Sequence, residues 1–322
     1  MKNKKDKENV LRKTSIGGQA VIEGVMMKGP EKIATSVRKS DGEIETEVKD
    51  VGKIRKNKFF KLPIIRGCVN FFDSMIIGVQ SLMYSAKFFD VDEDGNPAEE
   101  EPSKFEKWLE EKLGSEKMMN VVIYFSVILS LFFSVGLFII LPGAVGEFIR
   151  IHINNNAVVT FMEGVIRIGI FILYLALVSM TKDIKRVFMY HGAEHKAIYC
   201  YEHGEELTVE NVKKYTRLHP RCGTSFLLIV MVVSMLVFFF IPKMFFVYRL
   251  LLRLALMPVV AGISYEIIKY AGKHENTFTK IISAPGMWFQ YITTREPDDS
   301  QIEVAITSLK AVLPENKEDD KW

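Results

Sequence analysis

Several features are scarce in this chain of 322 residues, and each scarcity excludes a class of protein. Cysteine is scarce, and Cys68, Cys200 and Cys222 are all expected to face the reducing cytoplasm or to lie near its membrane boundary, so we expect no structural disulfide. A role as thiol or metal ligand stays open for them. No apolar run follows the basic segment 1–13, so we expect no secretory signal and a cytoplasmic N-terminus. The net charge is only +3 and no nucleic-acid-binding motif is recognisable, so no nucleic acid partner is expected.

Long apolar runs dominate the rest of the sequence. The mean hydropathy of +0.12 is high for a chain in which 25% of residues are charged, so the apolar residues must be segregated. The four runs are 121–145, 157–180, 224–246 and 250–268. Each is near the ~20 residues that a helix needs to cross ~30 Å of hydrocarbon. We therefore predict a mainly α integral membrane protein with about four transmembrane helices.

Ionisable residues occur inside two of these runs. Glu163 and Arg167 are four residues apart in the second run and share one helix face. Arg253 and Glu266 lie towards the ends of the fourth run, where long side chains can reach the interface. A buried core helix is the alternative for any single run. Membrane insertion is the simpler interpretation, because a soluble protein of this size rarely needs four such runs.

Positive charge is unevenly distributed between the loops, which predicts the orientation. Residues 181–223 hold eight Lys and Arg, whereas the opposite-side connections hold three. Cytoplasmic loops carry the excess of Lys and Arg, so 1–118, 181–223 and 271–322 are expected in the cytoplasm. We expect a multi-pass protein of the bacterial inner membrane with both termini cytoplasmic and basic residues facing lipid headgroups. A homo-oligomer or a membrane-protein partner would suit so small a membrane domain.

The chain divides into six predicted regions. Before the apolar runs, the Asp41-Gly42 pair between two β-favouring segments predicts a hairpin in a small antiparallel sheet. In order, the regions are a basic tail (1–15), a small β-rich cytoplasmic region (16–60), an amphipathic helix (61–89), an acidic linker with a membrane-proximal helix (90–118), a four-helix membrane domain with a cytoplasmic motif loop at 181–223 (119–270), and a C-terminal cytoplasmic segment with an amphipathic helix (271–322).

Helices outside the apolar runs are predicted in three places. Apolar residues in 62–89 recur at three- and four-residue spacing, so this helix either packs on the sheet or lies on the membrane surface. Residues 182–201 can continue the second membrane helix, and Thr208 could cap a short helix ending near Arg217. The Pro-Asp-Asp sequence at 297–299 predicts the start of a helix whose apolar face docks on the cytoplasmic domain.

The sharpest chemical signal is the sequence His-Gly-Ala-Glu-His at 191–195. His191 and His195 are four residues apart, so on a helix both imidazoles can bind one metal ion. Glu194 projects nearby, and this order is that of the inverted zinc-peptidase motif, in which the glutamate acts as general base. Five residues alone are a weak indication, and Gly192 costs such a helix ~1 kcal/mol relative to alanine.

A second cluster, His-Pro-Arg-Cys-Gly at 219–223, lies in the same predicted loop. His219 and Cys222 could supply further imidazole and thiolate ligands. At a helix N-terminus beside Arg221, the thiolate of Cys222 should be favoured, which suits either metal binding or nucleophilic chemistry. The alternative is a turn that contains a buried thiol.

Groups outside this loop could complete a metal shell. Glu266 is the most interesting of them, because placing an ionisable group at membrane depth costs free energy unless a partner stabilises its charge. Glu23 and the His274-Glu275 pair are further candidates, although salt bridges or solvated helix ends explain such groups more often. We predict zinc as the cofactor and Glu194 as the catalytic base. The predicted metal ligands are drawn from His191, His195, His219, Cys222 and Glu266.

Four segments together form a specific, ordered set. They are 18–27 (GQAVIEGVMM), 191–196 (HGAEHK), 219–224 (HPRCGT) and 293–299 (TTREPDD). In this order they resemble the YqhQ-type family of bacterial membrane proteins, over about residues 16 to 313. That family is described as predicted metal-dependent enzymes. The resemblance therefore implies a membrane protein with a metal site, and it names neither a reaction nor a substrate.

Two hypotheses for function remain open on the sequence alone. The first is a metal-dependent hydrolase at the cytoplasmic face of the membrane, in which water attacks a polarised carbonyl or phosphoryl group. The second is a non-enzymatic factor in membrane-protein biogenesis, assembly or regulation, with a structural metal or a polar network. Four protein ligands would close the site and favour structure, whereas three plus water would favour catalysis. A transporter is less well supported, because few charges lie inside the membrane runs.

Overall fold

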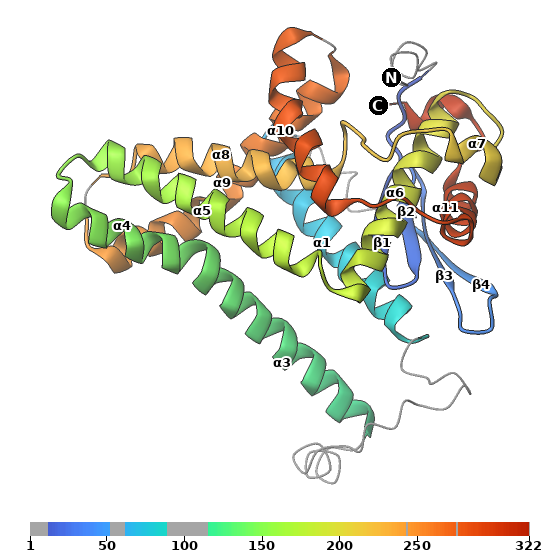
Figure 1. Cartoon of the computed structure of the whole chain (residues 1–322), viewed down its shortest axis with the longest axis horizontal. Coiled ribbons are helices and arrows are strands. Elements are labelled where there is room, and N and C mark those ends of the chain that lie inside the picture. Colours follow the sequence, from blue (N-terminus) through green and yellow to red (C-terminus); the bar gives the residue numbers. More distant parts are fainter. Residues whose placement is uncertain (1–11, 52–61, 89–114, 243, 275, 322) are drawn as a thin grey trace. The chain divides into compact units, whose positions relative to one another are not determined.

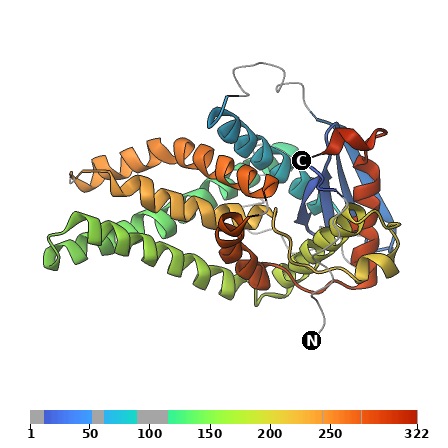
Figure 2. The same ribbon diagram turned by 90° about the horizontal axis from the view of Figure 1, so that it is seen from above.

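The computed structural model describes residues 12–51, 62–88, 115–242, 244–274 and 276–321 (Figures 1 and 2). The chain forms two compact units. Among the described residues, unit 1 comprises those before 89, 174–233 and those from 257 onwards, and unit 2 comprises 115–173 and 234–256. The described chain is mainly helical with one small antiparallel sheet near its N-terminal end, as predicted.

The sheet is a four-stranded antiparallel meander in the order β1-β2-β3-β4. The strands are β1 (Gly17–Val21), β2 (Gly24–Lys28), β3 (Lys32–Arg38) and β4 (Ile44–Asp50). The predicted hairpin at Asp41-Gly42 joins β3 to β4. Gly42 has a φ of 87°, a left-handed conformation that glycine adopts without steric cost.

Helices cover both faces of this sheet. The helices are α1 (Ile65–Ala86), α6 (Lys182–Glu202), α7 (Val209–Lys213) and α11 (Asp299–Val312). Successive strand residues point to opposite faces, so Ala34 joins the core formed with α6, α7 and α11, while Thr35 faces α1. Thr35 Oγ1 donates to Ser81 Oγ of α1 over 3.1 Å. Helix α1 therefore packs on the sheet, although Phe72 and Ile76 remain exposed.

The two helix starts that the sequence predicts outside the apolar runs are present. Asp298 caps α11 by accepting a hydrogen bond from the backbone N–H of Gln301. Thr208 caps α7 in the same way through Asn211, although α7 ends at Lys213 rather than near residue 217. Helix α10 (Thr277–Thr293) is an addition to the predicted elements. Its internal Pro285 would normally argue against a continuous helix.

Within the described residues, three apolar segments are long enough to cross a membrane by length and composition, which is compatible with membrane association. The first segment, 125–152, is composite: it contains the C-terminal part of α3 (Ser115–Val135), a π-helical turn (Gly136–Ile140) and α4 (Leu141–His152). The other two segments are the single helices α5 (Asn156–Val178) and α9 (Phe246–Lys273). The fourth apolar helix, α8 (Gly223–Phe239), has 17 residues and falls short of that length. Instead of the predicted four or so transmembrane helices, the described part of the chain has three helical segments of sufficient length and one shorter apolar helix.

Proline explains where these helices differ from the predicted runs. The third run was expected to extend to residue 246, but α8 ends at Phe239, three residues before Pro242. Proline has no N–H and disfavours a helical residue before it. The first run continues beyond the predicted end at residue 145 to His152, because the wider π-helical turn precedes Pro142 and the helix can resume there.

The second apolar helix and the motif helix are separate elements. Helix α5 ends at Val178, and a turn at 179–181 precedes α6. Thr181 is extended, with φ −69° and ψ 146°. The expected continuation of one helix through this region is therefore replaced by a break, after which α6 packs on the sheet of unit 1.

Candidate metal centre

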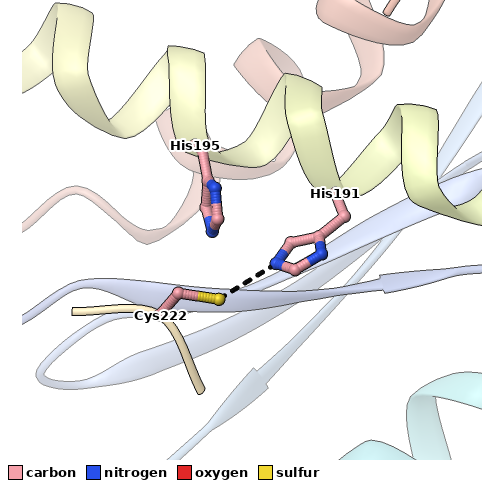
Figure 3. A group of neighbouring side chains, drawn as sticks. All are labelled: His191, His195 and Cys222. Atoms are coloured by element: carbon pink, nitrogen blue, oxygen red, sulfur yellow. Dashed lines mark hydrogen bonds between the residues drawn. The ribbon is translucent and has the colours of Figure 1, made fainter. Parts of the chain in front are cut away.

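Two turns of α6 and the segment just before α8 bring three potential metal ligands together (Figure 3). His191 and His195 project from one face of α6, and Cys222 approaches them from the loop that precedes Gly223. One ligand atom from each residue lies within 4.8 Å of the other two. These residues are three of the five ligands predicted from the sequence.

Backbone carbonyl groups fix the tautomers of both imidazoles. Nδ1 of His191 lies 2.8 Å from the carbonyl oxygen of Thr293, and Nδ1 of His195 lies 2.6 Å from that of Arg217. A carbonyl oxygen only accepts, so each Nδ1 carries a proton, and in the neutral imidazole each Nε2 then presents a lone pair. This is the arrangement in which protein histidines bind metal ions.

The two Nε2 atoms differ in what they contact. Nε2 of His191 lies 3.1 Å from Sγ of Cys222. Nε2 of His195 is buried and has no hydrogen-bond partner among the described residues. A buried polar atom without a partner costs about 1–3 kcal/mol, so its presence in a folded site requires an explanation.

Several contacts act on the ionisation of Cys222. Burial alone raises the pKa of its thiol, but the adjacent His195 and hydrogen bonds from Thr224 favour the thiolate, and the net pKa is lowered. The hydroxyl and backbone nitrogen of Thr224 lie 3.2 and 3.4 Å from Sγ. The sulfur therefore suits metal coordination, because the thiolate is the form that binds metal.

Glu194 lies beside the three residues but outside the group within 4.8 Å. Its side chain is buried, and burial raises its pKa to about 8, although nearby His191 and the N–H of Gly18 oppose this shift. Oε2 has no hydrogen-bond partner among the described residues. A Cβ on Gly18 would lie 2.9 Å from the carboxyl carbon of Glu194 and 2.5 Å from the carbonyl oxygen of Met26. Glycine at position 18 thus allows β1 to approach the glutamate.

A second glycine allows the chain to pass close to α6. A Cβ on Gly192 would lie 2.1 Å from the carbonyl oxygen of Arg295. The backbone N–H of Arg295 also donates to the carbonyl oxygen of Phe188 over 2.8 Å. The helix-weakening glycine in the motif therefore has a packing role, because it admits the segment that carries the Thr293 carbonyl to His191.

His219 lies next to the cluster but faces a different partner. Its ring centroid is 5.5 Å from that of His195, and its Nε2 lies 3.7 Å from Oε2 of Glu202, which also pairs with Arg221. Gln290 holds the backbone of His219 through two hydrogen bonds of 2.7 Å. Burial of the His219 ring lowers its pKa. Burial of Glu202 would raise the pKa of its carboxyl group, but the contacts with His219 and Arg221 outweigh this effect, and the pKa of Glu202 is lowered. The structure therefore places His219 in a supporting position.

The candidates from outside the loop that the structure describes have partners elsewhere. Glu266 pairs with Arg66 of α1, whose Nε lies 2.6 Å from Oε1, and the structure does not bring it to the cluster. Glu23, which has a φ of 48° at the turn between β1 and β2, pairs with Arg186 and accepts a hydrogen bond from the hydroxyl of Tyr190. His274 stacks on Tyr270. Glu275 lies outside the described residues.

Sequence reasoning missed the groups that orient the site. The carbonyl groups of Thr293 and Arg217 left no side-chain signal, because any residue can supply a carbonyl. The sequence motifs at 18–27 and 293–299 were recognised, but no role was predicted for them. In the structure both lie against α6, the first through Gly18 beside Glu194 and the second through the Thr293 carbonyl hydrogen-bonded to His191. Glu202 could have been suspected only from its place at the end of the motif helix.

Comparisons with known proteins bear on the family. The profile of the family described as "Protein of unknown function (DUF1385)" matches residues 62–315, which include His191, His195 and Cys222. The chain is also similar to the Bacillus subtilis (strain 168) protein described as "Uncharacterized protein YqhQ", with 36% identity over 299 residues that cover 92% of each chain. No solved structure matches. The chain therefore belongs to the DUF1385 family, and the resemblance to YqhQ-type proteins drawn from its motifs is confirmed.

Proposed function

We propose that this protein is a zinc-dependent hydrolase at the cytoplasmic face of the bacterial inner membrane. One observation carries the proposal. His191 and His195 each use Nδ1 on a carbonyl oxygen and turn Nε2 towards the cluster that contains Cys222. The same geometry would be an unusual coincidence for two histidines that served only to fill the core.

The residues present fit a zinc ion. Zinc binds imidazole nitrogen and thiolate sulfur, and three such ligands leave one position for water or substrate. The buried Nε2 of His195 and Oε2 of Glu194 are both without hydrogen-bond partners in the described chain. A bound ion would satisfy the first atom directly. A water molecule held at the remaining position could satisfy the second.

The protein's own groups have distinct roles in this proposal. When bound, zinc would supply Lewis acidity towards water and towards a carbonyl or phosphoryl oxygen of the substrate. Glu194 would accept the proton of the attacking water at Oε2 and return it to the leaving group. A nearby cation favours the carboxylate over the carboxylic acid, which opposes the raised pKa of Glu194. The carbonyl groups of Thr293 and Arg217 would keep both imidazoles in place.

A structural metal in a non-enzymatic assembly or regulatory factor is the second candidate. Burial favours it, because Glu194, His195 and Cys222 are only 4%, 1% and 7% exposed. Closed sites with four protein ligands are typical of structural zinc. In that case Glu194 would be a ligand or would orient one, rather than act as a base.

We further propose a multi-pass topology with both termini in the cytoplasm. Three segments meet the length for crossing, so an even number of crossings requires α8 to cross as well. Its 17 residues extend only about 25 Å at ~1.5 Å per residue, which is compatible with local thinning of the bilayer. The excess of Lys and Arg in 181–223 supports this orientation.

Cobalt substitution distinguishes the catalytic site from the structural one. In cobalt-loaded protein, coordination by Cys222 should produce a thiolate-to-metal charge-transfer band, and Cys222→Ser should abolish it. Added azide should shift the visible bands if one coordination position is open. Visible bands that do not respond to azide would identify a closed, structural site.

The variant Glu194→Gln tests whether Glu194 acts as the general base. The variant keeps the size and most hydrogen bonding of the side chain, so metal content should persist. Hydrolysis of generic ester, phosphate ester or peptide substrates, or complementation of a deletion strain, should fall by about 100-fold. His195→Ala should lose both metal and activity. Full function with retained metal in Glu194→Gln would support the structural alternative, and loss of metal would make the carboxylate part of the metal site.

A further inference from the structure

Unit 2 contains a second group of ionisable side chains, here called the arginine cluster. It consists of Glu147 and Arg150 on α4, Glu163 and Arg167 on α5, and Arg249 and Arg253 on α9. Each helix contributes two residues that are three or four positions apart and so share one face. The cluster is independent of the proposed metal site, whose residues all belong to unit 1.

Ion pairs connect most members of the arginine cluster. Arg253 pairs with Glu163, and Arg249 pairs with Glu147. Arg150 lies between the two carboxylates, 3.4 Å from Glu147 and 3.8 Å from Glu163. A Cβ on Gly146 would lie 2.2 Å from Oε1 of Glu163, so this glycine leaves room for the buried carboxylate.

Arg167 has neutral hydrogen-bond partners. Its Nε donates to the carbonyl oxygen of Phe138 over 2.9 Å, and its Nη1 donates to Oγ of Ser234 over 3.0 Å. The guanidinium also lies 5.5 Å from the ring centroid of Phe238. Its positive charge is therefore stabilised by dipoles and a ring rather than by a carboxylate in direct contact.

The cluster has more positive charge than negative charge. It holds four guanidinium groups and two carboxylates, an excess of two positive charges. Nη1 of Arg249 and Nε of Arg253 are buried and have no hydrogen-bond partner among the described residues. Unbalanced charge among apolar helices is expensive, and ionisable groups at such positions usually serve a ligand or an ion.

We propose that the arginine cluster binds a phosphate group, which takes the place of the Glu147 carboxylate. A phosphate supplies at least the one negative charge of the carboxylate that it replaces, and its several acceptor oxygens match the paired N–H donors of guanidinium groups. Glu147 is the carboxylate that a ligand can displace into solvent, because its side chain is 39% exposed whereas that of Glu163 is 2% exposed. In the structure the Glu147 carboxylate already bridges Arg150 and Arg249, so an anion is accepted at this point.

The position of the cluster indicates where the phosphate would come from. Arg150 lies two residues before the end of α4, and Arg249 lies three residues after the start of α9. Both are thus at an end of an apolar segment, where the headgroup of an anionic lipid would lie if these helices span the membrane. Free phosphate has the same recognising chemistry, so the experiment must separate the two sources.

Binding of defined probes to the purified full-length chain tests the proposal. The probes are fluorescent short-chain phosphatidylglycerol, the matching diacylglycerol without phosphate, and inorganic phosphate as competitor. Phosphatidylglycerol should bind saturably and diacylglycerol should not. Competition by inorganic phosphate would show that the phosphate group alone suffices, whereas its failure to compete would identify the lipid as the source. Equal binding of the two lipids, or saturable binding of none of the probes, would overturn the proposal.

Two substitutions should act in opposite directions. Glu147→Gln removes the carboxylate that competes with the ligand, so the affinity for phosphatidylglycerol should rise by about threefold or more. Arg249→Gln removes a ligand donor and should weaken binding by about tenfold or more. Lys182→Gln, at an exposed position on α6, is the matched control and should change nothing. Unchanged or weaker binding in Glu147→Gln would contradict the proposal, even if Arg249→Gln failed to fold.

Discussion

At the scale of single residues, ionising Glu194 costs free energy in the metal-free protein. Burial raises the pKa of Glu194 from 4.5 to about 8. Between these two pH values the folded protein keeps the carboxyl proton, whereas the unfolded chain releases it. The stabilisation from this group is therefore fully present below the unfolded pKa and is lost as the pH rises through the folded pKa. Chelated wild type should lose stability relative to Glu194→Gln as the pH is raised from about 5 to 8.

Denaturant unfolding of both proteins at several pH values measures this difference. Its upper bound is on the order of 4 kcal/mol, at about 1.4 kcal/mol per pKa unit. Excess zinc should reduce the difference, since a bound cation favours the carboxylate. A pH-independent difference between the chelated proteins would contradict the burial of an ionisable group at this position.

Gly18 and Gly17 form a matched pair for testing the contact between β1 and the motif helix. Gly18→Ala places a Cβ 2.5 Å from the carbonyl oxygen of Met26 and close to Glu194, so it should lower the free energy of unfolding by about 1–3 kcal/mol. A Cβ on Gly17 meets nothing within 4 Å, so Gly17→Ala should change stability much less. Thermal unfolding of both variants checks this, and equal effects would refute the close approach to Glu194.

The spacing of side chains predicted part of the site, and the tertiary contacts of those side chains decided the rest. His191 and His195 share a helix face by their spacing alone, and Cys222 precedes a helix as expected. His219 and Glu266 were predicted as metal ligands, but His219 lies against Glu202 and Glu266 pairs with Arg66. Such pairings depend on how distant segments pack, which local spacing does not encode. Metal binding itself stays a prediction.

At the scale of elements, local signals predicted helix starts better than helix ends. Asp298 and Thr208 were identified as starts because a capping side chain is a local feature. The end of α8 and the existence of α10 were missed, since the apolar run hid the effect of Pro242 and Pro285 lies inside a helix.

The cap of α11 provides a test at this scale. Asp298→Ala removes the acceptor for the N–H of Gln301 and should lower the free energy of unfolding by about 0.5–2 kcal/mol, because α11 covers the sheet. Asp299→Ala, one position later, is the control: it removes an exposed acidic group at the same helix end without removing the cap, so its effect should be smaller. Equal losses in chemical denaturation would refute the capping role.

At the scale of the whole molecule, the proposed topology can be tested by cysteine-accessibility labelling. Residue 155 lies between α4 and α5 in a predicted external connection, and residue 206 lies in the predicted cytoplasmic loop. In intact cells, an impermeant thiol reagent should label Asn155→Cys and should spare both Glu206→Cys and the unmodified chain. The reverse pattern would overturn the orientation and would move the candidate metal centre to the outer face.

Metal analysis of the purified full-length protein tests the central claim most directly. Wild type and His274→Ala, which changes an exposed histidine away from the cluster, should each contain about one zinc ion per chain. The double variant His191→Ala, His195→Ala should contain almost none, because it loses two of the three convergent ligands. Equal metal content in wild type and the double variant, or no metal in wild type purified from zinc-supplemented cells, would contradict the metal centre and the hydrolase proposed from it.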